Sequence, residues 1–227
     1  LPKSKVVERL IQGFWYNHTM VTEDFNKVDP QTYDDLQKWY KTTDAYIWEL
    51  SAYHLDPIFN YFVMCENTAN FLAEHNVKSI LVLGDGIGTM SLFMEEKGFN
   101  VWYNDLQDST TTAFALYRGF YHKFNTLLST GWTPPAPTQK FDAVLGFDFL
   151  EHMPNVEQWA HATYDYLNPG GLAYFRNAFG EGDAEHGNSI PMHLSINNKY
   201  VEEWNPLMNS VGLMKTELGN WRIKCVK

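Results

Sequence analysis

The hydrophobic pattern of the chain changes character near residue 77. Before that point, apolar residues recur at the spacing of helices. One stripe, interrupted near Thr43, consists of Tyr33, Leu36, Tyr40, Ile47 and Leu50. A second stripe follows a clean 3.6 period and consists of Ile58, Phe62, Cys65, Ala69 and Leu72. Asp29-Pro30 and Asp56-Pro57 are typical helix starts, and a further helix is expected over Lys5 to Phe14. We therefore predict a helical segment over residues 1–76.

After residue 77, short apolar runs alternate with helical stripes. Ser79–Leu83 is almost wholly apolar, which is typical of a parallel strand buried on both faces. Further strands are expected at Val101–Tyr103, Phe141–Phe147 and, after a turn at 168–171, Leu172–Arg176. Four helices are expected in this part of the chain. One ends at Gly98, one begins at Asn155 and one ends at Gly212. The fourth contains the stripe Ala113, Tyr117, Phe120, Tyr121 and Phe124. Three prolines make 131–139 a loop.

The carboxyl-terminal pattern differs from these strand–helix units. Two alternating runs flank Gly219-Asn220, which is a two-residue hairpin signal. Repeated strand–helix units that end in such a hairpin predict an α/β fold. The expected architecture is a doubly wound, mostly parallel sheet (residues 77–227) ending in an antiparallel hairpin, with an N-terminal helical lid (residues 1–76).

Composition narrows the function classes. The net charge of −10 disfavours binding to a phosphate backbone, so we expect no nucleic-acid partner. The apolar runs are shorter than the roughly 20 residues of a membrane span, which favours a cytoplasmic enzyme. Cys65 and Cys225 match no metal or redox spacing, and we expect two buried thiols. The oligomeric state stays open.

A glycine-rich turn follows the first predicted strand. It contains Gly84, Asp85, Gly86 and Gly88, and glycines let the backbone approach a ligand closely. Asp105 follows the second strand, 21 positions after Gly84. A carboxylate there can accept hydrogen bonds from ribose hydroxyls of a nicotinamide or S-adenosylmethionine cofactor, or it can cap a turn. The nicotinamide form is disfavoured because Ser91 replaces its last glycine.

The block from Phe141 to Pro154 reads FDAVLGFDFLEHMP, and Leu167-Asn-Pro-Gly-Gly171 follows it. With the glycine turn and Asp105, these residues resemble the class I S-adenosylmethionine-dependent methyltransferases, in particular a small-molecule branch with the block D-x-L-E-H-x-P. The resemblance covers about two thirds of the chain, from about Val77 onward. It implies S-adenosylmethionine as the cofactor and a cofactor-binding catalytic domain over 77–227.

The resemblance also implies roles for matching positions. Gly84, Gly86 and Gly88 would hold the methionine end of the cofactor. Asp105 would hold the ribose and Leu106 would pack on the adenine. Phe147 and Asp148 would face the methionine and the transferring methyl group. His152, oriented by Glu151, would be a general base at the substrate, although a histidine in this turn can also simply bond to the backbone.

The chain departs from the family pattern in two places. Val82 replaces an acidic residue two positions before the first glycine, so Asp85 is a candidate to hold the methionine amino group. The third strand of the family, with its adenine-contacting acid, has no clear counterpart before Phe141, and 125–130 is the only candidate.

The acceptor site is less well defined. Tyr46, Trp48 and Tyr53 belong to an aromatic cluster in the N-terminal segment, where they either line a substrate pocket or pack the helices onto the sheet. His186 and His193 lie in the loop after the last parallel strand, which normally shapes the substrate site, and no metal site is expected. Amine and hydroxyl acceptors are favoured. The alternatives are a catalytically silent, partner-binding subunit and a nicotinamide oxidoreductase.

Overall fold

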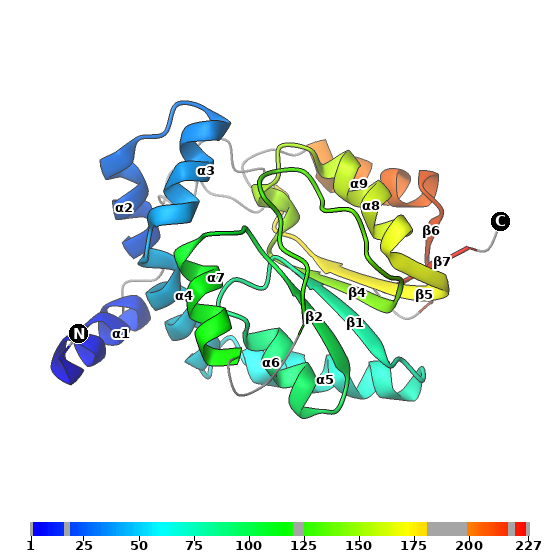
Figure 1. Ribbon diagram of the computed structural model, residues 1–227, viewed down its shortest axis with the longest axis horizontal. Coiled ribbons are helices and arrows are strands. Elements are labelled where there is room, and N and C mark those ends of the chain that lie inside the picture. Colours follow the sequence, from blue (N-terminus) through cyan, green and yellow to red (C-terminus); the bar gives the residue numbers. More distant parts are fainter. Residues whose placement is uncertain (1, 16–18, 120–124, 181–198, 218–220, 226–227) are drawn as a thin grey trace.

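The computed structural model describes residues 2–15, 19–119, 125–180, 199–217 and 221–225. Its centre is a seven-stranded sheet with the order β3-β2-β1-β4-β5-β7-β6 (Figure 1). The strands are β1 (Ser79–Leu83), β2 (Asn100–Asn104), β3 (Asn125–Thr126), β4 (Phe141–Phe147), β5 (Leu167–Arg176), β6 (Leu213–Lys215) and β7 (Trp221–Lys224). β1 to β5 are parallel, and β7 runs antiparallel to both β5 and β6. The predicted fold class is therefore confirmed.

Helices cover both faces of the sheet, because the central strands are apolar on both sides. Leu81 and Leu83 belong to a core cluster with α8 (Val156–Tyr166) and α9 (Lys199–Ser210). Ile80 and Val82 belong to a second cluster with α5 (Tyr61–Glu74) and α6 (Thr89–Glu96). These two layers lie on opposite sides of the sheet in Figure 1.

The N-terminal helices, α1 to α4, lie beside α7 (Thr110–Arg118) at one end of the molecule (Figure 1). They are α1 (Lys3–Trp15), α2 (Thr19–Val28), α3 (Tyr33–Thr42) and α4 (Ala45–Leu55). Thr43 and Asp44 separate α3 from α4, in agreement with the interrupted stripe. The hydroxyl of Thr110 donates to the Thr43 carbonyl, and His54 Nδ1 lies 3.0 Å from Thr89 Oγ1. These contacts join the N-terminal helices to α7 and α6, which flank the sheet.

Both Asp-Pro helix starts predicted from the sequence are wrong. Asp29 has φ 48° and its N–H donates to the Phe25 carbonyl (2.8 Å), so it closes α2. Thr32 caps α3 instead, because its side chain accepts from the backbone N–H of Asp35. Asp56 likewise caps the C-terminus of α4, and α5 begins only after Asn60. Ile58 therefore lies outside the helix and is 81% exposed.

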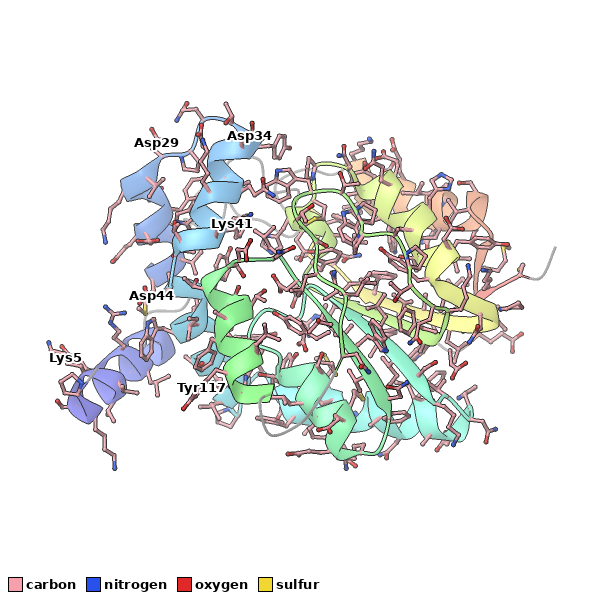
Figure 2. The ribbon with its side chains drawn as sticks, viewed as in Figure 1. Lys5, Asp29, Asp34, Lys41, Asp44 and Tyr117 are labelled. Atoms are coloured by element: carbon pink, nitrogen blue, oxygen red, sulfur yellow. The ribbon has the colours of Figure 1, made fainter. Side chains whose placement is uncertain are left out.

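The helix predicted along the stripe from Ala113 begins as α7, but two residues of that stripe do not face the core. Tyr117 is 79% exposed and projects away from the molecule in Figure 2, and Ala113 is exposed as well. The buried face consists of Thr111, Thr112 and Ala115. Ala115 packs closely against the glycine turn, since a Cβ on Gly88 would lie 3.1 Å from the Cβ of Ala115. Residues 120–124 of the predicted stripe lie outside the described residues.

Three smaller expectations change. The turn predicted at 168–171 is a bulge within β5, since Phe141 pairs with Leu167 and Ala143 with Leu172. α5 shares a core cluster with β1, so residues 61–74 pack with the sheet although the predicted lid extends to residue 76. Cys65 is buried, but Cys225 is exposed. Within the described ranges, none of the helices combines the length and hydropathy that a membrane crossing requires.

Candidate active site

A cavity of about 550 Å³ lies at the carboxyl ends of the parallel strands, which is where ligands bind in open α/β sheets. β1 contributes Gly84 and Gly86 from its following turn, β2 contributes Asp105, and β4 contributes Asp148. The opposite wall comes from the N-terminal helices. Its aromatic side chains are Tyr40, Tyr46 and Tyr53. The cavity is therefore enclosed between the sheet and the N-terminal helices.

Two glycines of the turn lie where a Cβ atom would meet a neighbouring side chain. Gly84 has φ +62°, and a Cβ there would lie 2.2 Å from Cδ2 of Phe149. Gly86 has φ +52°, and a Cβ there would lie 2.8 Å from a methyl group of Leu50. Both residues line the cavity, so the backbone of the turn is exposed to a ligand.

Asp85 is directed toward α6. Its two carboxylate oxygens accept from the backbone N–H groups of Met90 (3.1 Å) and Ser91 (2.7 Å). These N–H groups belong to the first turn of the helix, where a carboxylate is favoured. Burial raises the pKa of Asp85 to about 6. The carboxylate thus ties the glycine turn to α6, although Asp85 also borders the cavity.

Asp105 holds the turn from the other side. Its Oδ2 accepts from the Gly86 N–H (2.6 Å) and its Oδ1 accepts from the Leu106 N–H (2.6 Å). Burial raises the pKa of Asp105 to about 7. A carboxylate oxygen accepts more than one hydrogen bond, so each oxygen has capacity for a ligand hydroxyl. Leu106 lies beside it on the cavity wall, next to Ser129.

The end of β4 brings three polar side chains to the cavity. Asp148 follows Phe147 and has φ 48°, an uncommon backbone conformation for a residue other than glycine. Glu151 is 1% exposed, and its Oε1 accepts from the Ala178 N–H (3.0 Å). Its Oε2 is buried with no hydrogen-bond partner among the described residues. Burial, with a contribution from Asp148, raises the pKa of Glu151 to about 8.

His152 is held by an aromatic side chain of α3. The hydroxyl of Tyr40 lies 2.8 Å from His152 Nδ1, and the two rings meet edge to face. Tyr40 also stacks on Tyr46, with the ring centroids 5.6 Å apart. The sequence suggested Glu151 as the residue that orients His152, whereas the structure places Tyr40 in that position.

The predicted substrate residues separate into three groups. Tyr46 and Tyr53 line the cavity. Trp48 does not: its Nε1 donates to Asp44 (3.3 Å), and its ring lies under the Arg9 guanidinium. His186 and His193 lie outside the described residues. Within the described part of the chain, no three His, Cys, Asp or Glu side chains are grouped as metal ligands.

Comparison with known proteins identifies the family. A family model for a methyltransferase domain matches residues 59–210, which is well over half of the chain. The chain belongs to this methyltransferase family. The predicted methyltransferase family and its cofactor, S-adenosylmethionine, are therefore confirmed, whereas the branch with the D-x-L-E-H-x-P block stays a prediction.

Individual relatives of the methyltransferase are distant. A ubiquinone biosynthesis O-methyltransferase from Azoarcus sp. (strain BH72) is 30% identical over 101 residues, which are 43% of each chain. The chain thus matches less than half the length of this curated relative. An O-methyltransferase family protein from Burkholderia thailandensis has a TM-score of 0.57 at 10% identity, covering 95% of this chain and 70% of that chain. A candidate O-methyltransferase from Nostoc punctiforme PCC 73102 has a TM-score of 0.61 at 12% identity, covering 94% and 72%. These two structures support the fold.

The cavity of the methyltransferase fits S-adenosylmethionine in its donor set. Asp105 offers partly buried carboxylate oxygens for a ribose diol, and the glycines of the turn let the ligand lie close to the backbone. The sequence missed several further cavity residues, among them Tyr40, Ser129, Phe149 and Arg176. Arg176 had a usable signal, since it ends the last parallel strand, whereas Tyr40 lies more than one hundred residues from His152 in the sequence.

Proposed function

We propose that the protein transfers the methyl group of S-adenosylmethionine to a hydroxyl group of a small molecule. The observation that carries this proposal is the Tyr40–His152 contact of 2.8 Å on the wall of the cavity that Asp105 also lines. A histidine held in this way is suited to accept a proton, which a hydroxyl acceptor must lose and which an amine acceptor does not need to lose before attack. Amine acceptors are therefore the second choice.

The residues of the sheet hold the cofactor. The sulfonium group of the bound cofactor supplies an activated methyl group, so the protein mainly has to position the reactants. Asp105 accepts hydrogen bonds from the ribose, and Leu106 packs against the adenine. Gly84 and Gly86 let the chain pass close to the ligand. Asp85 contributes indirectly, because its bonds to Met90 and Ser91 fix the turn.

His152 removes the acceptor proton in this proposal. The productive tautomer has a proton on Nδ1, which His152 donates to the Tyr40 hydroxyl oxygen, and it keeps the Nε2 lone pair for the acceptor. Burial raises the pKa of Tyr40 far above its usual range, so Tyr40 keeps its own proton throughout. Tyr40 is thus a positioning residue and His152 the catalytic base.

The N-terminal helices exclude water from the reaction. Tyr40, Tyr46 and Tyr53 face the ends of β1 and β4 across the cavity. Methyl transfer requires the reacting atoms to be held roughly 3–3.5 Å apart in line, which a rigid aromatic wall favours. The wall also favours a flat or largely apolar acceptor.

The test is formation of S-adenosylhomocysteine from S-adenosylmethionine with a panel of phenols, alcohols and amines. With a hydroxyl acceptor, His152→Asn should lower kcat by about 10²–10⁴-fold, the usual contribution of a general base, and leave cofactor affinity within twofold. Tyr40→Phe should lower kcat less and move the pH profile, because it changes only the orientation of His152. Full turnover by His152→Asn would contradict the assignment of the base.

One observation favours a non-catalytic alternative, in which the chain binds a partner protein. Apolar side chains at the end of α4 and the start of α5 are exposed. They are Leu55 (63%), Ile58 (81%), Phe62 (45%) and Val63 (54%). Such surfaces occur at protein interfaces. Failure of the wild-type protein to bind S-adenosylhomocysteine would favour this alternative.

A further inference from the structure

An acidic and a basic side chain meet where β4 and β5 end. Asp148 directly follows β4 and Arg176 is the last residue of β5, and the Asp148 N–H donates to the Arg176 carbonyl (2.7 Å). The guanidinium Nη2 of Arg176 lies 3.4 Å from Asp148 Oδ2. Both residues line the cavity. Arg176 is the one Lys or Arg among the described residues of the cavity wall.

Fold stability does not account for this pair. The side chains are 46% and 40% exposed, and ion pairs this exposed contribute little to stability. The backbone of Asp148 is in the left-handed region (φ 48°), which among residues other than glycine is adopted mainly by aspartate and asparagine.

The environment of Arg176 prepares it for a carboxylate. Its Nη2 donates to the Tyr53 hydroxyl (2.9 Å), and its Nη1 lies 3.6 Å from the sulfur of Met64. These contacts fix the plane of the guanidinium at the cavity wall, and a planar guanidinium binds carboxylates through two parallel hydrogen bonds. Asp148, beside it, offers the opposite charge. An α-amino acid group, with its ammonium and carboxylate on one carbon, matches both.

The other acidic residues near the glycine turn are committed elsewhere. Val82, which replaces the acidic residue of the family pattern, is apolar and 1% exposed. Asp85 binds the first turn of α6, and Asp105 binds the backbone of Gly86 and Leu106. Glu151, the other acid after β4, is 1% exposed and accepts from the Ala178 N–H, so the half-exposed Asp148 is the acid at the ends of β1 and β4 that is best placed for an ammonium group.

We propose that Asp148 and Arg176 bind the amino acid end of S-adenosylmethionine, with Arg176 on the carboxylate and Asp148 on the ammonium group. This inference rests on the proposed function. The amino acid group would thus be recognised at the ends of β4 and β5, because Val82 in β1 has no polar side chain to bind it.

The test uses calorimetric titration with three nucleotides that lose these groups one at a time. S-adenosylmethionine has both groups, decarboxylated S-adenosylmethionine has only the ammonium group, and 5′-methylthioadenosine has neither. Arg176→Met should weaken binding of S-adenosylmethionine by roughly 10–100-fold, the usual worth of charge-assisted hydrogen bonds, and leave the other two within threefold. Asp148→Asn should weaken the first two by about tenfold and leave 5′-methylthioadenosine unchanged.

The substitutions remove charge while preserving the backbone of the site. Asparagine tolerates the left-handed backbone of position 148, so Asp148→Asn removes charge without adding strain. Arg9→Met is the matched control, since Arg9 pairs with Asp44 away from the cavity, and it should change no affinity. Equal effects of Arg176→Met on all three nucleotides, or no effect on any, would overturn the inference. Absence of binding to wild-type protein would instead refute the proposed function.

Discussion

The close contact between Gly84 and Phe149 makes a quantitative prediction. In Gly84→Ala, the new Cβ would lie 2.2, 2.7 and 2.9 Å from three carbon atoms of the Phe149 side chain, so the ring has to move. Phe149 is 7% exposed, and its ring meets Trp159 edge to face with the centroids 4.8 Å apart. The ring therefore has little space to move into.

Two costs add at this position. An alanine at φ +62° loses about 1–2 kcal/mol relative to glycine, because the left-handed region is unfavourable for L-residues. Overpacking against Phe149 costs a further ~1–3 kcal/mol. We expect Gly84→Ala to lower the free energy of unfolding by about 2–5 kcal/mol. Its affinity for S-adenosylhomocysteine should fall as well, since both residues line the cavity.

Gly98 provides the matched control. It has φ +91°, and a Cβ there would meet nothing within 4 Å, so Gly98→Ala should show the backbone cost of about 1–2 kcal/mol alone. Urea unfolding of the two variants and the wild type measures both values. If Gly84→Ala proves no more destabilising than Gly98→Ala, and binds the cofactor product equally well, the packing argument is refuted.

Two further predictions concern Glu151 and Trp48. The folded pKa of Glu151, about 8, lies above its ordinary value of 4.5, so the folded state holds the proton longer and stability falls as pH rises toward 8. Asp105, with a pKa raised to about 7, adds a loss of the same sign in this window, so Glu151→Gln should remove only the share of Glu151, about 1–2 kcal/mol between pH 6.5 and 8 in urea unfolding. The window starts at 6.5 because buried His54, with a pKa lowered to about 3, gives the opposite slope below it. An unchanged slope in Glu151→Gln would contradict the burial argument. Trp48→Ala should leave the affinity for S-adenosylhomocysteine within twofold, since Trp48 packs against Arg9 outside the cavity, and a tenfold loss would place it in the site after all.

The strands were predictable because their burial on both faces leaves a simple signal. Ser79–Leu83 and Phe141–Phe147 are apolar runs with the bounds that the structure has. Helix starts were less predictable, because an Asp-Pro pair can follow the end of one helix as well as precede the start of the next. Asp29 and Asp56 both lie at the ends of helices. The buried face of α7 consists of small and polar residues, so the apolar stripe that predicted this helix does not mark its buried face.

The residues of the candidate site likewise divide into those that the sequence could predict and those that it could not. Residues contributed by the glycine turn and by strand ends, such as Gly86, Asp105 and Asp148, could be found from sequence because their positions follow from strand boundaries. Tyr40 could not, because the packing of α3 against the β4 end decides its contact with His152. Trp48 was predicted from an aromatic cluster in the N-terminal segment, but in α4 its Nε1 donates to Asp44 outside the cavity.

Calorimetric titration with S-adenosylhomocysteine tests most directly whether the cavity binds S-adenosylmethionine through Asp105. We expect micromolar affinity for the wild-type protein and a loss of about 100-fold in Asp105→Ala, because the variant removes two charge-assisted hydrogen bonds to the ribose. A correctly folded wild-type protein with no detectable affinity, or an Asp105→Ala variant that binds as tightly as the wild type, would contradict this assignment.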